Sequence, residues 1–133
     1  MLIEIAQNTR RHAYAPYSGY RVGAAVLADS GFVYSGCNVE NASFGLSLCA
    51  ERAAVAKAVS EGETRFSAVV IVTDDGASPC GACRQTLAEF GLDTAVYMAR
   101  PDGEPAIRTV RQLLPASFSL RRGKRRPPPA PGD

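Results

Sequence analysis

The chain has 133 residues, of which 46% are hydrophobic, and it carries a formal net charge of +2. This size fits one folded domain with its own core. No stretch approaches the roughly 18 apolar residues of a membrane span, and charge interrupts the first apolar positions too early for a secretory signal. We therefore expect a cytoplasmic protein with no membrane partner.

The N-terminal part of the chain predicts a helix followed by a β-hairpin. Apolar residues at helical spacing indicate a helix over 2–12. Strand patterns follow over 22–28 and 32–37. The Asp29-Ser30-Gly31 sequence between them is typical of a hairpin turn.

The rest of the chain alternates helices and strands. After a polar loop at 38–45, an alanine-rich stretch predicts a helix over 48–59. The short apolar run at 68–72 predicts a strand covered on both faces. The later elements, in chain order, are a helix at 80–90, a strand at 94–99, a short strand at 106–108 and one or two helical turns at 110–114. This alternation favours an α/β fold in which a mixed sheet packs between helices.

The C-terminal segment has a different composition. Residues 121–133 hold four of the nine prolines, five basic residues and one acidic residue, which leaves the other residues with a net charge of −2. So polar a segment buries too little apolar surface to order itself. We expect one folded domain over 1–120 and a disordered basic, proline-rich tail over 121–133. Because the domain is mildly acidic, we expect no nucleic-acid partner.

Three of the four cysteines form a pattern that indicates a zinc site. Cys49 lies two residues before Glu51, and Cys80 and Cys83 form a Pro-Cys-x-x-Cys motif. The all-cysteine form of the zinc-dependent nucleobase deaminase signature has these two halves in this order. A structural zinc is normally enclosed by four protein ligands, whereas a catalytic zinc has three and leaves one position open. We expect one Zn²⁺ per chain, held by these three thiolates.

The residues around the cysteines have the chemistry that such a site needs. The predicted helix starts place the cysteines where free N–H groups and the helix dipole stabilise a thiolate. Glu51 is predicted to shuttle protons at the open position, as a carboxylate in a dry pocket can do. Arg52 is predicted to donate hydrogen bonds to the ligand sulfurs and so offset the charge of three thiolates. The single histidine, His12, is distant in sequence and is expected to have no role.

These motifs resemble those of cytidine deaminases of the short, homotetrameric type. The resemblance runs from about Tyr14 to Phe118, and it is most specific in Gly36-Cys37-Asn38-Val39-Glu40-Asn41-Ala42-Ser43-Phe44, in Cys49-Ala50-Glu51-Arg52 and in Pro79-Cys80-Gly81-Ala82-Cys83-Arg84-Gln85. It implies a three-layer α/β/α sandwich with a mixed five-stranded sheet. It also implies hydrolysis of cytidine and deoxycytidine to uridine and deoxyuridine, with release of ammonia, in pyrimidine salvage.

The same resemblance implies roles for further residues. Asn38 and Glu40 correspond to the residues that hold the ribose hydroxyl. Gln85 is expected to support the metal site. Phe44 and Phe118 match aromatic positions that close a neighbouring subunit's pocket, which implies a homotetramer with shared active sites. The substrate contacts implied beyond the ribose pair are Tyr20, Ala42, Phe44, Ala50 and Phe118. Tyr20 stands where the family often has phenylalanine, and its hydroxyl needs a partner if it is buried.

Four other interpretations are weaker. A blasticidin-type deaminase has similar zinc motifs, but the intact Asn38-Val39-Glu40-Asn41 argues for a nucleoside with an ordinary ribose. A polynucleotide-editing deaminase needs a basic groove. A closed four-cysteine structural zinc would require Cys37, which we expect to be a buried strand thiol, and would leave Glu51 without a purpose. A redox Cys-x-x-Cys protein would need a thioredoxin-like βαβ context before Cys80.

Overall fold

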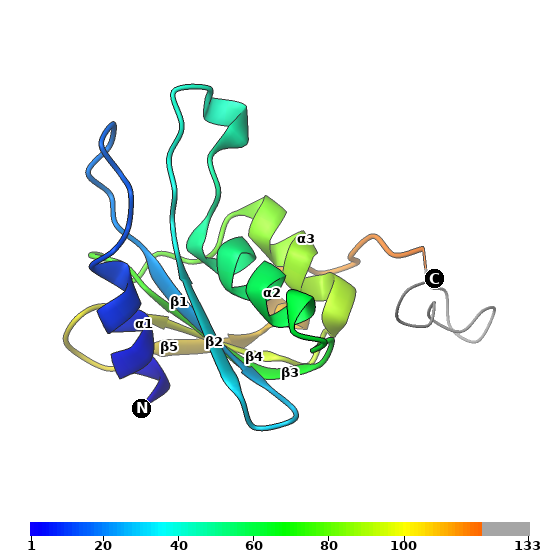
Figure 1. Cartoon of the computed structure of the whole chain (residues 1–133). Helices are drawn as coiled ribbons and strands as arrows, with labels where there is room; N and C mark the ends of the chain where they lie inside the picture. The colour runs from blue at the N-terminus through cyan, green and yellow to red at the C-terminus, as the bar shows by residue number, and fades with distance from the viewer. Residues whose placement is uncertain (121–133) are drawn as a thin grey trace.

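A computed structural model describes residues 1–120, and its central feature is a five-stranded mixed sheet (Figure 1). The strands lie in the order β2-β1-β3-β4-β5, with β3 and β4 parallel and every other neighbouring pair antiparallel. Their bounds are Gly23–Ala28 for β1, Val33–Cys37 for β2, Phe66–Val72 for β3, Ala95–Ala99 for β4 and Ala106–Thr109 for β5. The tail expected at 121–133 lies outside the described residues.

Helices cover both faces of this sheet. The helices are α1 (Leu2–Arg10), α2 (Ala50–Ser60), α3 (Gly81–Phe90) and α4 (Val110–Leu113), with a 3₁₀ turn η1 at Phe44–Leu46. One core cluster joins α1 to one face of the sheet, and a second joins α2, α3 and α4 to the other. The expected α/β/α sandwich with a mixed five-stranded sheet is therefore confirmed. Among residues 1–120, no helix is long and apolar enough to cross a bilayer.

The side chains of β3, the middle strand of the sheet, are buried on both of its faces. Val69 and Ile71 belong to the cluster under α2 and α3, whereas Val70 and Val72 belong to the cluster under α1. Successive strand residues point to opposite faces, so a strand covered on both sides needs an unbroken apolar run. Burial of each such side chain stabilises the folded state by about 1.5–3 kcal/mol.

Two glycines let helices approach the sheet closely. At Gly36, on β2, a Cβ would lie 2.6 Å from the backbone nitrogen of Ala54 in α2. At Gly23, on β1, it would meet the Ala6 carbonyl oxygen and lie 2.7 Å from Cβ of Arg10 in α1. Distances below 3.0 Å leave no room for a side chain. The distance of α2 from the sheet, and hence the position of the residues at its start, depends on Gly36.

Three sequence-based expectations need correction. The helix predicted over 48–59 begins at Ala50, because Leu48 instead exchanges two backbone hydrogen bonds with Val39. The helix predicted over 2–12 ends at Arg10. Cys37 is half-buried rather than buried, because it ends β2, an edge strand of the sheet.

Candidate active site

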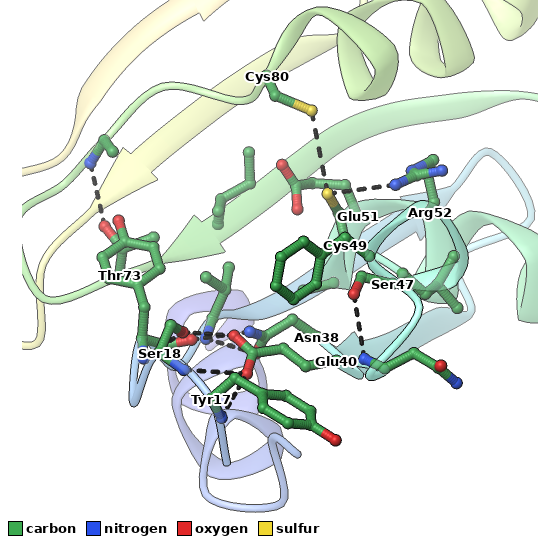
Figure 2. A pocket seen from close by; sticks show the side chains of 18 of the residues that line it. Tyr17, Ser18, Asn38, Glu40, Ser47, Cys49, Glu51, Arg52, Thr73 and Cys80 are labelled. Atoms are coloured by element: carbon green, nitrogen blue, oxygen red, sulfur yellow. Dashed lines mark hydrogen bonds between the residues drawn. The ribbon is translucent and has the colours of Figure 1, made fainter. Parts of the chain in front are cut away.

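A cleft of about 650 Å³ opens where the first residues of α2 meet the loop that leads to α3. Cys49, Glu51 and Cys80 line one end, and Asn38 and Glu40 line the other (Figure 2). The segments at 11–22 and 38–49 rise from the same end of the sheet (Figure 1) and supply much of its wall, together with residues at the end of β3 and in the loop that follows it. The fold therefore gathers residues that are distant in sequence into one concavity.

The start of each helix positions the cysteines. Cys49 is the N-cap of α2 and Cys80 is the N-cap of α3, and both have extended backbone dihedral angles. Cys83 follows in the first turn of α3 and is fully buried. The free N–H groups and positive dipole end of each helix thus lie at the sulfurs, where they favour negative charge.

The three sulfurs lie close enough to bind one metal ion. All lie within 4.8 Å of one another, with Cys49 Sγ 3.9 Å from Cys80 Sγ and Cys80 Sγ 3.5 Å from Cys83 Sγ. Tetrahedral zinc with Zn–S bonds of about 2.3 Å requires S···S separations of about 3.8 Å. Among residues 1–120 the cluster contains no fourth ligand side chain, so neither Cys37 nor Glu51 completes it. The residues fit a zinc ion that keeps one position open.

The protonation of the cysteines is already unequal. The Cys83 thiol donates to Cys49, and with the charge of Arg52 this holds the pKa of Cys49 at about 5, well below its ordinary value. The same hydrogen bond raises the pKa of Cys83. Arg52 Nη2 lies 3.4 Å from Cys49 Sγ. The guanidinium therefore makes the contact with a ligand sulfur that the sequence predicted.

Glu51 lies in the first turn of α2 and is only 5% exposed. Burial raises the pKa of its carboxyl group, and the negative charge of Cys49 raises it further. Its side chain lines the cleft near the sulfurs (Figure 2). A carboxyl group with a raised pKa, beside a metal position but outside its ligand set, can both accept and return a proton near neutral pH.

Asn38 and Glu40 occupy the opposite end, where backbone groups hold them in place. Asn38 donates through Nδ2 to the Tyr20 carbonyl at 2.8 Å and accepts from the Val22 N–H at 2.9 Å. Glu40 Oε1 accepts from the Tyr17 N–H at 3.0 Å, and its other oxygen accepts from the Ser18 hydroxyl. The Ser18 hydrogen bond lowers the pKa of the Glu40 carboxyl group, so it is a carboxylate at neutral pH.

The remaining predicted residues are only partly brought together. Tyr20, Phe44 and Ala50 line the cleft, although Phe44 is 80% exposed. Ala42 is exposed and is not among the lining residues. Phe118 is also outside the lining and 66% exposed. Gln85 donates to the Phe118 carbonyl at 3.1 Å, which makes it a support for the residues that follow α4.

Known proteins resemble this chain in both sequence and fold. Residues 1–99 match the family model of the cytidine and deoxycytidylate deaminase zinc-binding region. The chain belongs to this family. It is 46% identical over 121 residues to a cytidine deaminase of Sporosarcina psychrophila, covering 89% of each chain. It is 48% identical over 122 residues to one of Halalkalibacterium halodurans, covering 90% of this chain and 92% of the relative. The crystal structure of the cytidine deaminase from Burkholderia pseudomallei aligns with a TM-score of 0.85 at 43% identity, covering 88% of this chain and 96% of the other.

In this member of the cytidine deaminase family, the residues that hold the loops of the site in place were not predicted from the sequence. Arg84 donates to the Pro79 carbonyl at 2.8 Å, to the Ser78 hydroxyl at 2.9 Å and to the Leu113 carbonyl at 2.7 Å. Asp75 accepts from the Tyr20 hydroxyl at 2.8 Å. The only signal for Asp75 in the sequence is its place just after a buried strand, where sheet proteins commonly carry functional loops.

Proposed function

We propose that this protein catalyses zinc-dependent hydrolytic deamination of cytidine and deoxycytidine to uridine and deoxyuridine, with release of ammonia. The observation that carries the proposal is the three-sulfur cluster with a buried carboxyl group beside it and outside the ligand set. Family membership and cytidine deaminase relatives that the chain covers over 89–92% of their length support the same reaction.

Proton transfer falls to Glu51. Cys49, Cys80 and Cys83 would hold the zinc ion, which when bound would supply a water of lowered pKa as the nucleophile near neutral pH. Glu51 accepts one proton from that water and delivers it to N3 of the pyrimidine as the new C–O bond forms at C4. It then passes the second water proton to the amino group, and the C4–N bond breaks to release ammonia. The raised pKa of Glu51 suits both directions of transfer.

Arg52 has a supporting role in this chemistry. Three thiolates and one zinc dication carry a net charge of about −1, which weakens the metal as a Lewis acid. The contact from Arg52 Nη2 to Cys49 Sγ withdraws negative charge from one ligand. We therefore expect Arg52→Gln to lower kcat while zinc stays bound.

The substrate is a nucleoside whose sugar lies at the Asn38 and Glu40 end. A carboxylate has about four lone-pair positions, so Glu40 can accept from a sugar hydroxyl while it keeps its bonds to the loop at 17–18. The cleft reaches from these residues to the cysteines, as a base joined to a sugar requires. Residues 1–120 carry no excess of basic residues for a polynucleotide.

We also propose a homotetramer with shared active sites, working in the cytoplasm. Phe44, Leu46 and Phe118 are 66–80% exposed and lie near the cleft or just after α4, as aromatic and apolar residues buried by a neighbouring chain would. A site of reduced thiolates fits a reducing compartment. Size measurement in solution tests the assembly: Phe118→Ala is expected to weaken both the oligomer and activity, and a fully active monomer contradicts the sharing of sites.

The loss of absorbance on deamination tests the function itself. The purified zinc protein is given cytidine, deoxycytidine, blasticidin S and a single-stranded cytosine oligonucleotide. Turnover of both nucleosides is expected. Turnover of blasticidin S alone, or of the oligonucleotide alone, contradicts the proposed substrate class.

A further inference from the structure

Tyr20 links the two ends of the cleft through different parts of one residue. Its carbonyl oxygen accepts from the Asn38 side chain at 2.8 Å, and its hydroxyl donates to Asp75 Oδ1 at 2.8 Å. Asn38 lies at the sugar end, whereas Asp75 lies in the loop between β3 and α3 that leads to Cys80. Among residues 1–120, Tyr20 is the only residue with hydrogen bonds to both Asn38 and Asp75.

Asp75 is a fixed attachment point for the tyrosine hydroxyl. Its Oδ1 also accepts from the Thr73 hydroxyl at 3.1 Å and from the Ala77 N–H at 3.2 Å. The Ala77 N–H in turn lies 3.0 Å from the Thr73 hydroxyl oxygen, and Thr73 is buried. The Tyr20 hydroxyl therefore joins a small network in which the first residues after β3 hold one another in place.

The protonation states keep this bond in place near neutral pH. Burial, with Asp75 adding to it, raises the pKa of the Tyr20 phenol, which therefore stays a donor. The Tyr20 hydrogen bond lowers the pKa of the Asp75 carboxyl group, which therefore stays an acceptor. Hydrogen bonds to a charged acceptor are stronger than neutral ones.

A second attachment runs beside the first. Arg10, at the end of α1, forms an ion pair with Asp74 and donates through Nε to the Arg21 carbonyl at 2.9 Å. Asp74 and Asp75 thus connect the loop after β3 to the N-terminal part of the chain, the first through an ion pair and the second through a hydrogen bond. Asp74 holds α1, which lies outside the cleft, whereas Asp75 holds Tyr20, which lines it. Of the two attachments, the Tyr20–Asp75 bond is the one that bears on a bound nucleoside.

We propose that Tyr20 is a positioning residue whose hydroxyl, by bonding to Asp75, sets the separation between the sugar-binding side chains and the metal end of the cleft. A nucleoside has a fixed distance between its sugar hydroxyls and C4 of its base, so the two ends must be held at the matching distance. A phenylalanine would keep the ring surface and lose this attachment. The inference rests on the proposed nucleoside function.

The test compares Tyr20→Phe with two matched tyrosine controls in the zinc-loaded protein. Tyr34→Phe removes a tyrosine–carboxylate hydrogen bond to Glu63, at 3.0 Å, from a residue that does not line the cleft. Tyr14→Phe removes the hydroxyl of an exposed tyrosine in the same N-terminal part of the chain. For Tyr20→Phe we expect KM for cytidine and deoxycytidine to rise about three- to tenfold, with kcat changed less than about twofold. Both controls should keep the wild-type KM, although Tyr34→Phe should lower the melting temperature.

A double-mutant cycle isolates the bond to Asp75. Asp75→Ala is expected to raise KM at least as much as Tyr20→Phe, because it also releases Thr73 and Ala77. Adding Tyr20→Phe to Asp75→Ala should then change KM by less than about twofold. An unchanged KM in Tyr20→Phe, or an equal effect of Tyr20→Phe with and without Asp75, overturns the inference. Absence of nucleoside turnover by the wild-type zinc protein overturns the proposed function instead, so the two failures are distinguishable.

Discussion

Replacing Glu51 by glutamine should abolish most of the activity without removing the metal. The amide has the shape of the carboxyl group but cannot accept the proton of the attacking water. Among the described residues that line the cleft, the other carboxylate is Glu40, which lies at the sugar end and is held by Tyr17 and Ser18. General acid–base catalysis contributes about 10²- to 10⁴-fold, and with no substitute nearby we expect the upper end, about 5.5 kcal/mol in activation free energy.

The assay for Glu51→Gln is the initial rate of absorbance loss on cytidine, with zinc content and melting temperature measured on the same sample. Because the metal cluster does not include Glu51, about one zinc per chain should remain. Cys83→Ser is the matched control and should lose both zinc and activity. A Glu51→Gln protein that keeps zinc and more than about a tenth of the wild-type kcat would refute the role of this carboxyl group.

Three further predictions follow from the geometry. Cys37→Ser should retain zinc and activity, since Cys37 lies outside the sulfur cluster, and metal loss measured by elemental analysis would contradict the open site. Gly36→Ala should destabilise the protein by about 1–3 kcal/mol in denaturant unfolding, because its Cβ would lie 2.6 Å from a backbone nitrogen of α2, whereas Gly45→Ala, with no atom within 4 Å, should be near neutral. The Ser18 hydrogen bond lowers the pKa of Glu40, so its stabilising effect is fully present above about 4.5 and is lost as pH falls through the lower folded value. The difference in melting temperature between wild type and Glu40→Gln should therefore shrink in acid, and a difference that grows there would contradict the reasoning.

The sequence predicts the metal site well because its information is local. Cysteine spacing and helix starts are short-range features, and the apolar run of β3 shows directly that both of its faces are covered. These features predict a mixed sheet between helices, whereas the resemblance to cytidine deaminases implied the three-layer sandwich and the meeting of Cys49 with Cys80 and Cys83. The predicted start of α2 is wrong because alanine propensity extends backward past Leu48, while the backbone pairing of Leu48 with Val39 depends on how the preceding loop folds.

The supports of the site could not be predicted for a related reason. Tyr20 and Asp75 lie 55 residues apart, and Arg84 and Leu113 lie 29 apart, so no local pattern connects them. A lone tyrosine, aspartate or arginine carries no spacing signal, and its partner is decided only when the sheet brings distant loops together. Cys37 shows the same limit, because its exposure depends on β2 being an edge strand.

Arg84 has a practical consequence for anyone who modifies the C-terminal end of this protein. One guanidinium donates hydrogen bonds to the Pro79 carbonyl, immediately before Cys80, and to the Leu113 carbonyl at the end of α4. A truncation that removes Leu113 would therefore loosen a cysteine more than thirty positions upstream. An affinity tag or fusion partner attached after Leu120 leaves both of these Arg84 hydrogen bonds in place.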